Sequence, residues 1–283
     1  MAVLTAALVS VPLFTASAEA GAWDRERDRV GEVSLGATLL MTTASRRGEV
    51  VPARIRAVDD LDAGVGEAAR SVGLGTPVLS AAFRNALAGS VAARTDPVDV
   101  VSLPDLAGVE IVAGGATDDG VLVPEPLVDR AALGPGASIT LAGAYGTVVL
   151  PVSGVYVPPV APPAGSRGAP GALAAPEPDP FTGEVARPAS VVLAPRELAL
   201  RTAETLTEDL DLAWSLPLEE SVGLSGARAA AERFDALQTT LLDPDGPVAG
   251  VEDADVGSAI VRTPLPDAFA AVDRTTGLLA PPV

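Results

Sequence analysis

The chain has 283 residues, 48% of them hydrophobic, and 19 Lys+Arg against 37 Asp+Glu give a formal net charge of −18. The apolar content excludes an acidic disordered tail, and the charge excludes a nucleic-acid binder, because phosphates are met by clusters of basic residues. The chain has no His and no Cys. This removes His- and Cys-based catalysis, the usual zinc sites, haem, iron–sulfur clusters and disulfides, so we expect no cofactor and no metal.

The first 18 residues carry no charge, which is the lower limit for crossing the hydrocarbon core of a bilayer. Three interpretations remain open: a membrane anchor, a secretory signal cleaved after the small residues Ala16-Ser17-Ala18, or an ordinary buried helix. We favour a transmembrane-like helix over residues 1–22, with Trp23 at the headgroup level. The expected anchor residues are Val3, Leu4, Leu8, Val9, Val11, Leu13, Phe14 and Trp23.

Residues 24–88 predict three helices and one β-hairpin. Charges of alternating sign over Asp24–Arg29 are typical of a solvated helix, and period-two alternation over Val33–Met41 predicts a strand that turns into a second strand at Val50–Ile55. We expect a helix over Asp59–Val72, because acidic residues would lie in its first turn and glycines follow it. A further helix is expected over Val78–Ala88.

The rest of the first part reads as β-rich. Strands are expected at Val98–Leu103, Val109–Val112 and Val121–Val123, a helix at Glu125–Leu133, and strands at Ser138–Leu141, Thr147–Val152 and Val155–Val157. A Pro/Gly-rich stretch over residues 158–189 then reads as a loop or linker. It divides the chain into a first α+β part, residues 23–157, and a second α+β part, residues 190–283.

The second part predicts strands at Ser190–Leu193 and Leu210–Leu216, and helices at Pro195–Thr205, Ser225–Leu242 and Ala268–Val283. Ser225 is the expected cap of its helix, and Trp214 is expected in the core. The candidate residues for contact with a partner are Leu224, Phe234 and Leu237. The predicted fold class is α+β, with mixed β-sheet units and packed helices, preceded by one N-terminal transmembrane-like helix.

Three polar patterns are candidates for a metal site, a catalytic site or a nucleotide-binding loop. Asp243, Asp245 and Gly246, with acidic residues downstream at Glu252, Asp253 and Asp255, lack the spacing of a calcium loop, so a surface turn is favoured. Asp59, Asp60 and Asp62 fit the start of a helix better than a glycosidase pair, although a carboxylate-only enzyme is the catalytic alternative. Gly64-Val-Gly66 and Gly73-Leu-Gly75 fall short of a nucleotide-binding loop, and no Lys is present.

The order of these elements resembles the extracytoplasmic domain of actinobacterial FtsX-like (MacB-type) ABC transporter permeases. The resemblance is carried by ALVSVPLFTASAEAGAWDRERDRV at the start, by VLVPEPLVDRAALGPGASITL and TVVLPVSGVYVPP in the middle, and by VVLAPRELALRTAE with LAWSLPLEESVGLSGARAAAERFDAL later. Family members continue into further membrane helices. We therefore expect this chain to be either a fragment of a longer permease or a shortened relative acting outside the membrane.

The resemblance implies a non-enzymatic domain that binds a substrate or partner and transmits motion driven by a separate ATPase subunit. The implied partners are a cytoplasmic ABC ATPase reached through the full permease, the membrane, and a second permease copy or an extracytoplasmic protein. The implied location is the cell membrane, with the main domain on the extracytoplasmic side. The alternative is a secreted or anchored stand-alone module that binds a carbohydrate or a protein.

Overall fold

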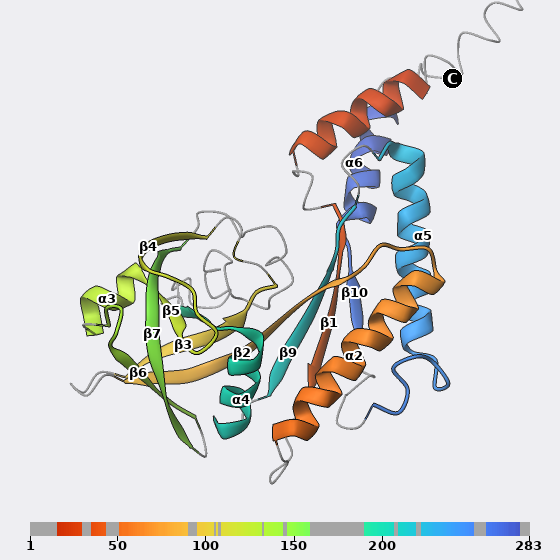
Figure 1. The fold of residues 1–283 in the computed structure, drawn as a ribbon. Helices are drawn as coiled ribbons and strands as arrows, with labels where there is room; N and C mark the ends of the chain where they lie inside the picture. The colour runs from red at the N-terminus through yellow and green to blue at the C-terminus, as the bar shows by residue number, and fades with distance from the viewer. Residues whose placement is uncertain are drawn as a thin grey trace, which may run out of the picture.

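The fold is α+β, as predicted (Figure 1). The computed structural model describes residues 16–29, 35–43, 51–89, 95–104, 106, 109–131, 133–143, 146–158, 190–206, 209–218, 222–251 and 259–277. Its strands are β1 (Ala37–Thr43), β2 (Val78–Gly89), β3 (Thr95–Ser102), β4 (Glu110–Gly114), β5 (Val121–Pro124), β6 (Ser138–Ala142), β7 (Thr147–Val157), β8 (Ser190–Leu193), β9 (Leu210–Leu216) and β10 (Ile260–Arg262). Its helices are residues 16–29, α2 (Val51–Ser71), α3 (Glu125–Ala131), α4 (Arg196–Leu206), α5 (Leu224–Leu241) and α6 (Leu265–Gly277).

Six strands close into a ring. The pairings run β2–β3–β8–β5–β7–β6 and return from β6 to β2. The pairs β3–β8 and β5–β7 are parallel, and the other pairs of the ring are antiparallel. The larger of two clusters of buried hydrophobic residues forms the core. All six strands contribute side chains to it, and so do α2, α4, α5 and α6. Closure removes the free edges of these strands.

A second group of strands forms an open sheet in the order β10–β1–β9–β2. Strand β2 belongs to both assemblies, because Val78–Ala82 pair with β9 whereas Leu87–Gly89 pair with β6. The register with β3 shifts between Phe83 and Ala86, where the strand passes from the open sheet to the ring. The open sheet and the ring are therefore joined by a continuous strand, and we use these two names below.

Helices α2 and α5 pack together and supply buried residues to the core beside the open sheet, including Leu61, Val65, Phe234 and Leu237. Helix α4 contacts α2 and the ring strands β2, β3 and β7. A smaller hydrophobic cluster holds Tyr156, whose hydroxyl donates a 2.7 Å hydrogen bond to the Val191 carbonyl. Burial raises the pKa of Tyr156, so this phenol is neutral and structural.

Two predictions of secondary structure were wrong. Residues expected to form a hairpin strand and the start of a helix form one continuous helix from Val51, so Asp59, Asp60 and Asp62 lie in its middle. Pro52 falls in the first turn, where its missing N–H costs nothing. The run Val78–Ala88 is a strand although its composition favours a helix, because β3 and β9 pair with it along both edges.

Most other elements agree with the prediction. Strand β9 has the predicted bounds, and the alternation of β1 buries Ala37, Leu39 and Met41 on one face. Helix α5 is capped at Gly223 without a side-chain hydrogen bond, so Ser225 is not its cap. Strand β10 was missed, because its three residues carry too little pattern to stand out. Strands from both sides of residues 158–189 share the ring and the open sheet, so the two parts are interleaved.

Glycine at position 64 permits the close approach of α2 to the segment that follows α5. A Cβ there would lie 2.7 Å from the Pro247 carbonyl oxygen, whereas a Cβ at Gly66 would meet nothing within 4 Å. We expect Gly64→Ala to lower the free energy of unfolding by about 1–3 kcal/mol. Gly66→Ala, the matched control in the same helix, should raise it by about 0.5–1 kcal/mol. Urea unfolding followed by circular dichroism measures both, and equal effects would contradict the close approach.

Candidate functional site

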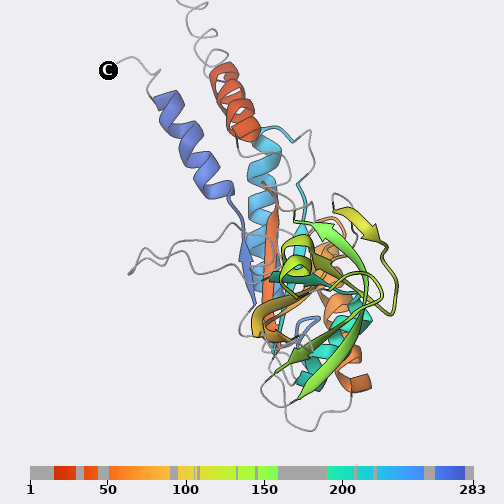
Figure 2. The ribbon, with the colours of Figure 1, turned by 90° about the vertical axis from the view of Figure 1, so that its left-hand side faces the viewer.

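The first and last helices of the described part of the chain lie together at one end of the molecule. The 16–29 helix and α6 both stand beyond the open sheet, away from the ring, and the start of α5 reaches the same end (Figures 1 and 2). We call these three segments, namely residues 16–29, α6 and residues 222–228, the stem.

Local signals account for the two outer helices of the stem. The 16–29 helix is rich in Ala and carries the ion pairs Asp24–Arg27 and Glu26–Arg29, each three residues apart on one face. At the start of α6, the Thr263 hydroxyl accepts a hydrogen bond from the Leu265 N–H at 3.3 Å, and Asp267 lies in the first turn. An acidic residue there complements the helix dipole.

Trp23 is the centre of the stem. Its side chain is buried, its indole N–H donates a 2.9 Å hydrogen bond to the Val222 carbonyl, and its ring lies 6.0 Å from the ring of Phe269, centroid to centroid. One side chain of the 16–29 helix therefore contacts both α6 and the segment before α5. Trp23 and Val222 are 199 residues apart in the sequence, so this contact fastens distant parts of the chain.

Charged groups surround this apolar contact. The Arg228 guanidinium of α5 lies 6.0 Å above the Phe269 ring and 3.8 Å from an Asp273 carboxylate oxygen. The hydrogen bond from Arg29 holds the pKa of Glu26 below its usual value, with Arg274 of α6 adding to the effect. Arg228 and Asp273 are exposed, so their ion pair contributes about 0–1 kcal/mol and the buried Trp23 supplies most of the adhesion.

The burial of Trp23 differs from the position we expected. A tryptophan at headgroup level faces lipid, whereas Trp23 is only 1% exposed as a residue. The remaining anchor candidates, Val3 to Phe14, lie outside the described residues. Within the described part, no helix combines the length and apolarity needed to span a membrane.

The three candidate partner-contact residues on α5 are placed differently from one another. Phe234 and Leu237 are buried in the core against the open sheet, so they are unavailable to a partner. Helical periodicity identified the apolar face of α5 correctly, but that face covers the protein's own core. Leu224 is half-buried, at the first residue of α5 and inside the stem.

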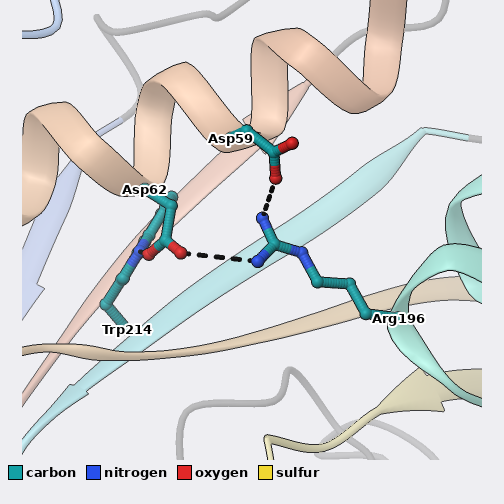
Figure 3. A network of polar contacts seen from close by, with 4 residues as sticks. All are labelled: Asp59, Asp62, Arg196 and Trp214. Carbon is teal, nitrogen blue, oxygen red and sulfur yellow. Dashed lines mark hydrogen bonds and ion pairs between the residues drawn. The ribbon is translucent and has the colours of Figure 1, made fainter. Parts of the chain in front are cut away.

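A second polar cluster links α2, α4 and β9 (Figure 3). Arg196, at the start of α4, donates to Asp59 at 2.7 Å and pairs with Asp62 at 3.5 Å, both on α2. Asp62 also accepts a 2.8 Å hydrogen bond from the indole N–H of Trp214, which is fully buried in β9. Trp214 therefore lies in the core as predicted, and its one polar group is satisfied by a charged acceptor.

This cluster was missed by sequence reasoning, which assigned Asp59 and Asp62 to a helix start. Their spacing of three residues placed them on one helix face, which was the available signal. Nothing near Arg196 in the sequence indicated that α4 would begin beside that face. The pairing depends on the fold of the whole chain, since the two partners are separated by 134 and 137 residues.

The other polar patterns have structural roles. Asp243 accepts a hydrogen bond from the Asp245 N–H at 3.0 Å, which makes a turn after α5. In the part of the chain that the structure describes, no three acidic residues gather as a metal site; Glu252, Asp253 and Asp255 lie outside it. Gly73 adopts a φ of 74° and ends α2, which is the left-handed conformation that favours glycine.

One groove, with a volume of about 880 Å³, runs between α2 and the segment after α5. Its charged lining is balanced, with Arg56 and Arg70 against Asp60 and Glu67. Arg70 donates to the Gly66 carbonyl of its own helix at 3.1 Å. The groove therefore offers neither a concentrated charge nor a buried polar group that would select a ligand.

No protein-family model and no curated protein matches this chain. Solved structures with similar folds include a domain assigned to a permease protein of Porphyromonas gingivalis, with 12% identity, a TM-score of 0.39, and coverage of 82% of this chain and 92% of that one. The periplasmic region of MacB from Actinobacillus actinomycetemcomitans has 8% identity, a TM-score of 0.43, and coverage of 88% and 98%. The extracellular domain of the noncanonic ABC-type transporter YknZ from Gram-positive bacteria has 9% identity, a TM-score of 0.38, and coverage of 72% and 93%.

The burial of Trp23 predicts that α6 depends on it. Trp23→Ala should lower the free energy of unfolding by about 3–5 kcal/mol, because a large buried side chain is lost. Trp23→Phe keeps a ring but leaves the Val222 carbonyl without its donor, which should cost about 1–2 kcal/mol. Urea unfolding measures these losses, and hydrogen exchange measures the opening of residues 265–277.

The control is Arg25→Ala, an exposed position on the same helix, which should change stability by less than about 0.5 kcal/mol. Exchange of the α6 amides at wild-type rates in Trp23→Ala would contradict the role given to Trp23.

Proposed function

We propose that this chain is the extracytoplasmic domain of an FtsX-like ABC transporter permease. In this role it binds a substrate or partner and passes on motion that a separate cytoplasmic ATPase subunit drives. The observation that carries the proposal is the stem, where the first and last described helices pack side by side at one end of the domain. A domain inserted between two membrane segments needs this arrangement, because both of its ends must return to the same surface.

The contacts of the stem also suit the transmission of motion. Trp23 joins the 16–29 helix to α6 and to the segment leading into α5, and α5 packs on α2 and beside the open sheet. A displacement of the 16–29 helix is passed on through Trp23, because closely packed interiors deform little and transmit strain. The route then runs from the stem along α5 to the open sheet.

The proposal gives the domain a mechanical and binding role without a catalytic residue of its own. ATP hydrolysis is assigned to the partner subunit, which the rest of the permease contacts on the cytoplasmic side. Residues 1–22 are proposed as a membrane segment that runs into the start of the stem, with Val3 to Phe14 facing lipid and Trp23 packed within the stem. A second permease copy or an extracytoplasmic protein is the proposed further partner, and Leu224 at the stem is the remaining candidate for contact with it.

The test is made on the native protein in its own cells. An antibody raised against the purified domain is used to follow the chain through separation of membranes from culture medium. We expect it in the membrane fraction, accessible to protease added to intact cells, and co-isolated in mild detergent with an ATP-hydrolysing subunit. Deleting residues 1–18 should release the domain from the membrane.

The opposite result favours the alternative, a secreted or anchored binding module for a carbohydrate or a protein. A species recovered from the medium, shortened at its N-terminus and free of any ATPase, would overturn the permease proposal. The background control repeats the isolation in the same detergent with an unrelated membrane protein in place of this one. Any ATP-hydrolysing subunit that is also recovered with that protein was captured non-specifically.

A further inference from the structure

The polar cluster on α2 spans the junction between the ring and the open sheet. Asp59 and Asp62 belong to α2, which packs with α5, and Trp214 belongs to β9 of the open sheet. Arg196 begins α4, directly after the ring strand β8, and α4 contacts the ring strands β2, β3 and β7. The ion pairs of Arg196 therefore join α4 and the ring to α2, the helix that packs with α5 beside the open sheet.

The cluster has one fixed and one releasable half. The Trp214 indole is fully buried and needs an acceptor, so its 2.8 Å bond to Asp62 holds whenever the core is intact. The Arg196 side chain is 40% exposed, and Asp59 and Asp62 are 57% and 34% exposed. Water can replace these ion pairs when they separate, so breaking them costs far less than breaking a buried pair.

The covalent link beside the cluster can bend. Strand β2 changes its partner from β9 to β6 along its length, and its register with β3 is interrupted between Phe83 and Ala86. A bulge of this kind bends a strand without breaking it. The ring and the open sheet are thus connected by a strand with an irregular middle, share the buried core to which α2 and α4 both contribute, and are joined at the surface by an exposed ion pair.

We propose that Arg196, with Asp59 and Asp62, is a latch that fixes the angle between the ring and the open sheet. When the ion pairs separate, α4 and the ring shift against α2 by sliding over their shared core, with the bend taken up in the middle of β2, while Asp62 stays bonded to Trp214. The latch is a property of the folded domain. Its use in passing on motion rests on the function proposed above, whereas its existence is tested without a membrane or an ATPase.

The absence of cysteine from the chain allows two spin labels to be placed without background. Ser138 on the ring strand β6 and Asp235 on α5 are both exposed. Spin labels on Cys variants of these two residues report the distance between the ring and the helix beside the open sheet. We expect double electron–electron resonance to give one main distance in the otherwise unchanged protein. Arg196→Gln should raise the population of a second distance about two- to fivefold, which is the range of exposed ion pairs.

The matched control is Arg201→Gln. Arg201 lies on the same helix, is also exposed, and pairs with Glu197 within α4, so its loss leaves the junction untouched. Its distance distribution should match that of the unchanged protein. Asp59→Asn is a second, milder variant at an exposed position, and it should shift the distribution in the same direction as Arg196→Gln.

Salt supplies an independent readout, because about 1 M salt screens exposed charges within a few ångströms. The unchanged domain should move toward the distribution of Arg196→Gln, and that variant should respond little further. Superimposable distributions for the unchanged domain, Arg196→Gln and Asp59→Asn would overturn the latch. They would leave the permease proposal standing, because that proposal is decided by location and by the co-isolated ATPase.

Discussion

Strand β2 is the element on which the remainder of the fold depends. It is one of the longest strands, and it pairs with β3 along one edge while its other edge serves β9 and then β6. The ring closes only because β6 finds this second half of β2, and the open sheet is anchored only because β9 finds the first half. A single run of backbone hydrogen bonds therefore supports two assemblies whose other strands come from distant parts of the chain.

The stem adds a constraint of a different kind. Its first helix is separated from its other two segments by most of the chain, yet the indole of that helix contacts both of them. Apolar burial provides the adhesion, and the surrounding Arg, Asp and Glu side chains keep the outer surface hydrated. The domain is thus held together by buried aromatic contacts where its two described ends meet, whereas the contact of α4 with α2 combines a buried core with ion pairs that water can reach.

The sequence predicted what depends on local pattern. Alternation located β1 and the strands from β5 to β9, and helical spacing located α5 and its apolar face. It failed at Val78–Ala88, where small helix-favouring residues are drawn into a strand by partners on both sides. It also failed over the first residues of α2, because Val50–Ile55 was predicted as the second strand of a hairpin. The stem and the Arg196 cluster were beyond prediction, because contacts such as Trp23–Val222 and Arg196–Asp59 exist only once the strand order is known.

The closed ring also limits the strand edges that the described part of the chain leaves free. Strands of other chains can pair with the open edges of a sheet, which leads to aggregation. Such edges are a greater hazard in a chain that is 48% hydrophobic. Here the ends of the strand order are β4 and β10, of five and three residues, and β4 is interrupted by a shift of register between Ile111 and Ala113. Among the described strands, both edges of the sheet are therefore short or irregular, which makes them poor templates for an added strand.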